Sequence, residues 1–166
     1  MWLEPNFGGI LPELKAVPNW VLAKAEVRDG KITKPPYQPN GQRASHTKKE
    51  TWSTFAAVKK GYEEGGYIGV GFVLDGKPHF GGRYVHGFDW DHCIEGDVLD
   101  PSVEAKLNDL RISRIELSVS GTGIRGFFLH DEPLASRRTW IGDRSVELYS
   151  AQRYMTTTGR GKGVLA

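Results

Sequence analysis

Residues 84–92 read Tyr84-Val85-His86-Gly87-Phe88-Asp89-Trp90-Asp91-His92. Aromatic and β-branched residues dominate this run, which favours a strand over residues 84–91. Because successive side chains of a strand point to opposite faces, Asp89 and Asp91 are expected side by side, with Phe88 and Trp90 buried on the other face. Two adjacent carboxylates repel each other unless a cation lies between them, and oxygen ligands of this kind suit Mg²⁺ or Mn²⁺. A strand end with two exposed acids is the alternative, which this motif alone does not exclude.

A second polar segment follows, with the sequence Glu116-Leu-Ser-Val-Ser-Gly-Thr-Gly-Ile-Arg125. Gly121 and Gly123 allow backbone amides to approach an anion closely. Ser118 and Ser120 can donate hydroxyl hydrogen bonds, and Arg125 offers a planar fork for phosphate oxygens. The segment is therefore a candidate triphosphate-binding loop, and a glycine-rich hairpin turn with a surface arginine is equally compatible with it.

A third acidic position lies in Val146-Glu147-Leu148-Tyr149. Glu147 alternates with apolar neighbours, so its side chain should project from the face opposite to Val146 and Leu148. By itself Glu147 is an exposed strand residue. Together with Asp89 and Asp91 it is a candidate third carboxylate of a two-metal site.

Around these segments, turn residues and apolar patterns predict an α+β domain with a largely antiparallel sheet. Helices are expected over residues 11–16, 52–64 and 101–110, the second capped by Thr51 and the third by Asp100. Further strands are expected over residues 20–27, 67–74, 114–119, 124–130, 145–149 and 154–158, with turns at Asp29-Gly30 and Asp75-Gly76. Residues 1–159 are predicted to form one domain, and residues 160–166 the start of a linker within a longer protein.

Composition sets outer bounds on the class of protein. The chain has 166 residues, which suits one domain with a real core, and its 39% hydrophobic and 25% charged residues are ordinary for a globular protein. No apolar run reaches the length of a membrane span, so no membrane partner is expected. A single cysteine, Cys93, indicates an intracellular protein without an internal disulfide. The net charge of +2 neither indicates nor excludes a nucleic-acid partner.

The three polar segments occur in a recognisable order. They read Asp89-x-Asp91-His92-Cys93, then Ser118-x-Ser120-Gly121-x-Gly123-x-Arg125, then Val146-Glu147-Leu148-Tyr149-x₃-Arg153-Tyr154-x-Thr156-x-Thr158-Gly159. In this order the chain, from about Trp20 to Gly159, resembles phage- and plasmid-encoded primase-polymerases of the archaeo-eukaryotic primase superfamily. The N-terminal segments Lys34-Pro-Pro-Tyr-x-Pro-Asn-Gly41 and Gly69-Val-Gly-Phe-Val-Leu74 also resemble those that precede the first acidic motif in such proteins.

The resemblance implies the primase catalytic core, an RNA-recognition-like, mostly antiparallel sheet joined to a second small α/β unit. It implies catalytic and metal-binding roles for Asp89, Asp91 and Glu147 with two Mg²⁺ or Mn²⁺ ions. Ser118, Ser120, Gly121, Gly123, Arg125 and Arg153 are the candidate nucleotide-binding residues. In the wider superfamily the second motif is Ser-x-His, so here Gly123 replaces the serine and Arg125 the histidine. Arginine can still bind phosphate, but it does not titrate near neutral pH.

The implied activity is that of a DNA primase and DNA polymerase in the replication of a phage or mobile element. Its partners would be nucleoside triphosphates, a single-stranded DNA template with its primer, and a helicase domain or protein. Its place would be the cytoplasm of a bacterial host. Two alternatives remain open at this stage. One is a primase-fold module that mainly binds single-stranded DNA or a replication origin, and the other is a metal-dependent nuclease.

Overall fold

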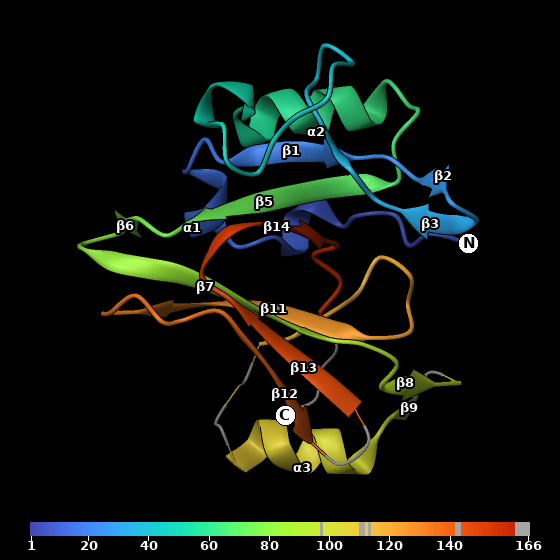
Figure 1. Cartoon of the computed structure of the whole chain (residues 1–166), viewed down its shortest axis with the longest axis vertical. Coiled ribbons are helices and arrows are strands. Elements are labelled where there is room, and N and C mark those ends of the chain that lie inside the picture. The colour runs from blue at the N-terminus through green and yellow to red at the C-terminus, as the bar shows by residue number, and fades with distance from the viewer. Residues whose placement is uncertain (97, 110–111, 113, 142–143, 162–166) are drawn as a thin grey trace.

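The computed structural model describes residues 1–96, 98–109, 112, 114–141 and 144–161 (Figure 1). Its helices are α1 Pro12–Lys15, α2 Phe55–Glu63 and α3 Pro101–Asp109, with 3₁₀ turns at Phe7–Gly9 and Lys49–Thr51. Its first strands are β1 Trp20–Ala23, β2 Glu26–Arg28, β3 Lys31–Thr33, β4 Pro36–Tyr37, β5 Gly69–Asp75, β6 Pro78–His79 and β7 Arg83–Trp90. The remaining strands are β8 Ile94–Glu95, β9 Val98–Leu99, β10 Glu116–Leu117, β11 Ile124–His130, β12 Arg137–Ile141, β13 Arg144–Tyr149 and β14 Ala151–Thr157.

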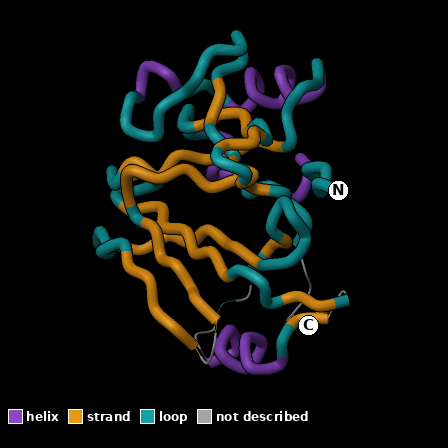
Figure 2. The backbone as a smooth tube through the Cα atoms, turned by 45° about the vertical axis from the view of Figure 1, so that its right-hand side comes forward, coloured by secondary structure: helices purple, strands orange, loops and turns teal. Residues whose placement is uncertain are grey.

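Two antiparallel sheets stack between two helices, as the successive layers of Figures 1 and 2 show. The first sheet has the strand order β14-β5-β1-β4, and α2 packs on its outer side. The second sheet has the order β10-β11-β7-β13-β12, with β6 paired to β7, and α3 lies on its far side. The architecture is therefore α+β with antiparallel sheets, as the sequence predicted.

Two apolar clusters hold the layers together. Val70, Phe72, Val85, Phe127 and Met155 belong to the core cluster that joins the two sheets, and the rings of Phe72 and Phe127 meet edge to face at 6.0 Å. A second cluster, between the second sheet and α3, contains Phe88, Trp90, Val103, Leu107 and Ile124. The face opposite to Phe88 and Trp90 is therefore left for Asp89, as alternation along the strand predicted.

The two sheets approach closely at Gly87 of β7. A Cβ at this position would lie 2.3 Å from Sδ of Met155 on β14, so the Met155 side chain would have to shift to make room for it. Glycine therefore lets the Met155 side chain of β14 pack directly against the backbone of β7 where the two strands cross, two residues before Asp89. The crossing holds the end of the first sheet directly over the acidic end of β7.

Several predicted elements are confirmed with small shifts in their ends. The strand over residues 124–130 has the predicted bounds, and the Asp29-Gly30 turn joins β2 to β3 with positive φ angles of 51° and 74°. Helix α3 begins at Pro101 as predicted, and Leu110 at its expected end lies outside the described residues. Strand β10 is antiparallel to β11, as expected for the two sides of the glycine-rich loop.

The predicted start of the second helix is wrong. Thr54, not Thr51, caps α2, by accepting a hydrogen bond from the Ala57 amide at 3.3 Å. Ser53 instead exchanges backbone hydrogen bonds with Trp20 of β1, at 2.8 and 3.0 Å, so the chain is still extended there. Pairing with the sheet therefore delays the helix by three residues.

Two predicted strands are shorter than expected. The strand over residues 20–27 divides into β1 and β2, because the Lys24 amide bonds to the Pro35 carbonyl and β2 pairs with β3 instead. The strand expected over residues 114–119 is reduced to β10. The Val119 carbonyl accepts a hydrogen bond from the Leu3 amide, so Val119 does not pair with β11.

The packed chain extends beyond residue 159. The Leu117 amide donates to the Arg160 carbonyl at 3.0 Å, and Gly161 forms a bridge with Glu116. The rest of the predicted linker, 162–166, lies outside the described residues. Among the helices that the structure describes, none has the length and apolar character needed to cross a membrane.

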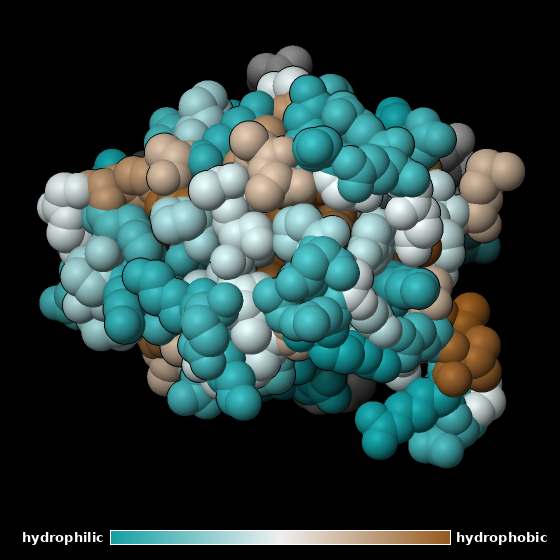
Figure 3. All heavy atoms as spheres, turned by 90° about the horizontal axis from the view of Figure 1, so that it is seen from above, coloured by the Kyte–Doolittle hydropathy of each residue, from teal (hydrophilic) through white to brown (hydrophobic). Residues whose placement is uncertain are grey.

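The outer face over α2 is mostly hydrophilic, as Figure 3 shows from above. Lys59 and Lys60 form exposed ion pairs with Glu63 and Glu64 along this helix, at 3.7 and 3.8 Å. Such exposed pairs contribute little stability and mark a solvated surface. The concentration of buried charge lies elsewhere, between the two sheets.

Candidate functional site

Five charged residues form one row across the second sheet. The strand register places Glu116 opposite Arg125, Arg125 opposite Asp89, Asp89 opposite Glu147, and Glu147 opposite Arg138. Directly opposed residues of neighbouring strands point to the same face. The row therefore runs from β10 to β12 on the face that looks toward the first sheet.

Two of the three predicted acids, Asp89 and Glu147, are the third and fourth residues of this row, and Asp91 lies beside them. The side chains of Asp89 and Glu147 are 18% and 15% exposed, and Asp91 follows in the turn after β7, where it is exposed. All three line one cavity of about 850 Å³. The structure thus places Asp89, Asp91 and Glu147 in the lining of one cavity.

The cavity has three walls. The second sheet provides one, β14 of the first sheet provides another, and the β2–β3 hairpin with the following Pro35-Pro36 segment provides the third. Its basic lining residues are Arg28, Lys34, Arg43, Arg125, Arg138 and Arg153. A cavity with acidic residues surrounded by basic residues is suited to a metal-bound polyphosphate. The carboxylates can hold the metal ions, and the basic side chains can contact the phosphate oxygens.

Arg125 is the central cation of the row. Its side chain is 6% exposed, and Nη2 donates to Oδ1 of Asp89 at 2.9 Å. Nη1 donates to the carbonyl oxygen of Thr156 on β14 at 3.0 Å and also to the Thr156 hydroxyl. Nε has no hydrogen-bond partner among the described residues. Arg125 therefore connects the two sheets at the acidic end of the cavity.

Asp89 lies in an environment that disfavours its charged form. Burial raises the pKa of its carboxyl, and the neighbouring charges of Asp91 and Glu147 raise it further, against the opposing effect of Arg125. The net pKa is above the ordinary value even though the ion pair with Arg125 is formed. An added cation beside Asp89 would relieve this unfavourable balance.

Glu147 has compensating partners of its own. Arg138 donates to its Oε1, and the Tyr149 hydroxyl donates to its Oε2. Burial favours a higher pKa for Glu147, but the Tyr149 and Arg138 hydrogen bonds outweigh it and lower the pKa. Arg153 adds to the same group, because its Nη2 donates to the Tyr149 hydroxyl at 3.0 Å and its guanidinium lies 4.5 Å from that ring.

Lys34 enters the site from the loop after β3. Burial lowers the pKa of its ammonium and Arg125 lowers it further, while Asp89 and Asp91 oppose the shift. Its Nζ also lies 5.5 Å from the ring centre of Trp2. A lysine held beside one cation, Arg125, and two acids, Asp89 and Asp91, can contact an incoming phosphate at little cost in reorganisation.

The donor set fits divalent metal in its chemistry but not yet in its spacing. Within the part of the chain that the structure describes, no three His, Cys, Asp or Glu side chains converge closely enough to hold an ion together. Arg125 pairs with Asp89, and Arg138, whose side chain is 62% exposed, pairs with Glu147. Asp89, Asp91 and Glu147 are the carboxylates that would hold Mg²⁺ or Mn²⁺ if Arg138 were displaced from Glu147.

The glycine-rich loop lies beside the cavity and not in its lining. The Ser118 hydroxyl is buried, accepts from the Gly123 amide at 3.1 Å and lies 3.1 Å from the Ser120 hydroxyl. Of the candidate nucleotide-binding residues, Arg125 and Arg153 line the cavity, whereas Ser118, Ser120, Gly121 and Gly123 do not. The hydrogen bonds of Ser118 are thus used to close its own loop.

Gly123 has a different role, in placing the acidic turn. A Cβ on Gly123 would lie 2.5 Å from the Trp90 carbonyl oxygen and 3.2 Å from Cα of Asp91. The Ile94 amide also donates to the Thr122 carbonyl at 3.1 Å. The loop therefore packs backbone to backbone against the turn that carries Asp91.

Sequence reasoning missed Arg138, Tyr149 and Thr156 as site residues. Arg138 lies on a strand that the sequence did not predict, and Arg137-Arg138 reads as a solvated basic pair. Tyr149 and Thr156 could have been suspected from the sequence, because they lie in the third motif, two and nine residues after Glu147 respectively. Alternation along β13 could have placed Tyr149 on the face of Glu147, whereas Thr156 lies on β14 of the other sheet, where alternation says nothing about Glu147.

Comparison with models of known protein families finds no match for this sequence, and comparison with curated proteins finds no relative.

Proposed function

We propose that this chain is a metal-dependent nucleotidyl transferase of the primase-polymerase kind, which extends a nucleic-acid strand on a DNA template. The observation that supports it best is the pairing of Asp89 with Glu147 on neighbouring strands, beside Asp91, in a cavity whose other charged lining residues are mostly basic. Carboxylates and basic residues in one cavity are what a metal-bound polyphosphate requires, because the carboxylates bind the metal ions and the basic residues contact the phosphate oxygens.

Each acid has a distinct part in this proposal. Asp89 and Glu147 hold cations from the sheet, and Asp91 adds a carboxylate from the exposed turn. Bound Mg²⁺ or Mn²⁺ would activate the attacking 3′-hydroxyl and stabilise charge on the leaving pyrophosphate. Tyr149 holds Glu147 in place through its hydroxyl, which keeps the carboxylate on the cavity side of β13.

The basic groups are arranged for the triphosphate of an incoming nucleotide. Arg125 is preorganised by Asp89 and Thr156, so its guanidinium does not have to reorganise when phosphate arrives. Lys34 and Arg153 contribute from the other two walls. Two further cavity arginines, Arg28 and Arg43, lie on the hairpin side, where they can contact the backbone of a template or primer.

A second candidate function is nucleic-acid binding without efficient catalysis. One specific observation favours it, namely that Arg125 pairs with Asp89 and Arg138 pairs with Glu147. A binding module could use these ion pairs simply to hold the sheet together. The acids would then be dispensable for binding, whereas the cavity arginines would not.

Extension of a labelled primer on a single-stranded template separates the two functions. We expect wild-type protein to add nucleotides with Mn²⁺ or Mg²⁺, and expect D89N and E147Q to lose most of this activity while they still bind the primed template. R153Q, by comparison, should keep a measurable rate. Binding without extension by well-folded wild-type protein under all metal and triphosphate conditions would instead support the binding module.

A further inference from the structure

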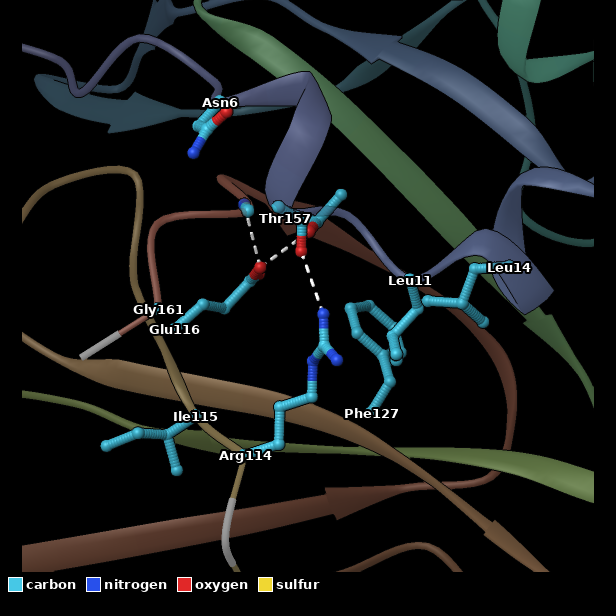
Figure 4. Close-up of a pocket in the computed structure, with 12 residues that line it drawn as sticks. Asn6, Leu11, Leu14, Arg114, Ile115, Glu116, Phe127, Thr157 and Gly161 are labelled. Atoms are coloured by element: carbon cyan, nitrogen blue, oxygen red, sulfur yellow. Dashed lines mark hydrogen bonds between the residues drawn. The ribbon is translucent and has the colours of Figure 1, made fainter. Parts of the chain in front are cut away.

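Glu116, the first residue of the charged row, has no part in the chemistry proposed so far. It is buried on β10, and Figure 4 shows its side chain pointing toward Thr157, where both residues line a second cavity of about 620 Å³. The Thr157 hydroxyl donates to Oε2 of Glu116 at 2.7 Å, and the Gly159 amide donates to the same oxygen at 2.9 Å. The Thr158 amide donates to Oε1 at 3.2 Å. A buried carboxylate with these donors is fully engaged, so it is a structural anchor and not a vacant ligand site.

The anchor joins the two sheets. Glu116 belongs to the edge strand of the second sheet, whereas Thr157 ends β14 of the first sheet. The Thr158 hydroxyl donates to the Leu117 carbonyl at 2.7 Å, and the Leu117 amide donates to the Arg160 carbonyl. Residues 157–160 are thereby fixed to β10 on the side of the site that is opposite to Glu147.

The fixed segment begins next to the residue that holds Arg125. Thr156 accepts both hydrogen bonds from Nη1 of Arg125, through its carbonyl and its hydroxyl. A displacement of Thr157 moves Thr156 with it, since the two are joined by one peptide unit. The geometry thus links Glu116 to Arg125 through Thr157 and Thr156.

Charge links the same two residues directly. Glu116 and Arg125 are opposed across β10 and β11, so Arg125 lies between Glu116 on one side and Asp89 on the other. Burial raises the pKa of Glu116, and the donors from Thr157 to Gly159 together with Arg125 oppose that rise. Arg125 therefore has an acid on each side of its strand, Asp89 in direct hydrogen-bond contact and Glu116 acting on it directly through charge alone.

We propose that Glu116 is a positioning residue, which fixes the end of β14 and so aims the Arg125 guanidinium at the triphosphate. The positioning of the Arg125 guanidinium by Glu116 is inferred from the described contacts alone, whereas its effect on triphosphate binding rests on the proposed function. Two experiments test these two claims separately. One observes the guanidinium alone, and the other measures nucleotide use.

The first experiment records the ¹⁵N–¹H guanidinium signals of arginine in the intact protein. A guanidinium held on both terminal nitrogens rotates slowly, so Arg125 should give separate Nη signals that R125K identifies by their loss. E116Q keeps the side-chain size but removes the charge, and T157V removes one donor to the same carboxylate. In both variants the separate signals should broaden or merge.

The second experiment is a double-mutant cycle in primer extension. E116Q should raise the KM for triphosphate by about tenfold, within the usual range of coupling between contacting residues, with a smaller change in kcat. In an R125A background, E116Q should cause no further change. Such non-additivity is expected where one residue acts through the other.

D75N serves as the matched control. Asp75 is also a buried carboxylate, which accepts hydrogen bonds from Asn19 and the Lys77 amide, but it lies at the opposite end of the β5–β14 pair. D75N should alter stability without altering the Arg125 signals or the KM. Unchanged Arg125 signals in both E116Q and T157V would overturn the positioning role. Changed signals with fully additive kinetics would leave Glu116 as a positioning residue for Arg125 and refute its effect on triphosphate.

Discussion

Asp89 of β7 lies directly opposite Glu147 of β13, so two carboxylates face each other across one pair of antiparallel strands. Like charges in this arrangement destabilise the pairing of the strands. Arg125 offsets the charge of Asp89 and Arg138 offsets that of Glu147, which allows the strands to pair without a metal ion. The central feature of the site is thus a pair of mutually repelling carboxylates, Asp89 and Glu147. The exposed Arg138 neutralises one of them, and the buried Arg125 neutralises the other.

Replacement of the buried Arg125 should destabilise the protein. R125M removes the cation between Asp89 and Glu116 and leaves the Thr156 hydroxyl and carbonyl without their donor. Breaking a buried ion pair from one side costs about 3–5 kcal/mol in the free energy of unfolding. Urea denaturation of R125M should show a loss of this order, whereas R153M, at an exposed position, should change stability by less than about 0.5 kcal/mol. Equal stability of R125M and R153M would refute the central place of Arg125.

Replacement of the exposed Arg138 should strengthen metal binding. R138Q removes a positive charge that competes with metal for Glu147, so the affinity for Mn²⁺ in the absence of nucleotide should rise several-fold. R137Q is the matched control, because Arg137 precedes Arg138 on β12 but lines the cavity on the α3 side of the sheet. Calorimetric titration with Mn²⁺ compares the two. The idea fails if R138Q binds metal more weakly than R137Q.

Much of this site could be predicted from the sequence, because alternation along a strand is a local property. The period of two placed Asp89 opposite in face to Phe88 and Trp90, and Glu147 opposite in face to Val146, and the structure confirms both. The register between strands is not local. The pairing of Asp89 with Glu147 depends on which strands become neighbours and on the length of the loops between them, which no short pattern encodes.

The failures of prediction have similar causes. Thr51 has a capping side chain, but that hydroxyl donates to the Lys48 carbonyl at 2.7 Å, and the pairing of Ser53 with Trp20 delays the helix. Strand β12 begins with Arg137 and Arg138, a charged pair that has no apolar alternation. Its strand conformation follows from pairing with β13, so tertiary contacts decided it and not the local sequence.

The loop that follows β10 should control the position of Asp91. G123A places a Cβ within 2.5 Å of the Trp90 carbonyl, so either the loop or the turn at Asp91 must shift. We expect a loss of about 1–3 kcal/mol in stability together with a large loss of metal affinity. G69A is the control, since its Cβ would meet Val119 at an ordinary 3.7 Å. Retention of wild-type metal affinity by G123A would show that the loop does not position Asp91.

The raised pKa of Asp89 should appear in the pH dependence of stability. Between its ordinary value of 3.8 and its higher value in the folded protein, the folded state binds more protons than the unfolded state. Stability contributed by Asp89 therefore falls as the pH rises through this window. The wild type should lose stability relative to D89N over that range in EDTA, and Mg²⁺ should remove the difference. Urea denaturation at several pH values measures it, and a rise of wild type relative to D89N would contradict the assigned direction.

Anomalous diffraction from crystals that contain Mn²⁺ and a non-hydrolysable triphosphate tests the central claim most directly. The account predicts a manganese peak bound by the carboxylates of Asp89, Asp91 and Glu147, at about the 2.0–2.1 Å of Mg²⁺–oxygen bonds. It also predicts that Arg138 has moved away from Glu147 and that Arg125 contacts a phosphate oxygen. A triphosphate bound elsewhere, with no manganese between these acids and with both arginine pairs intact, would contradict the account.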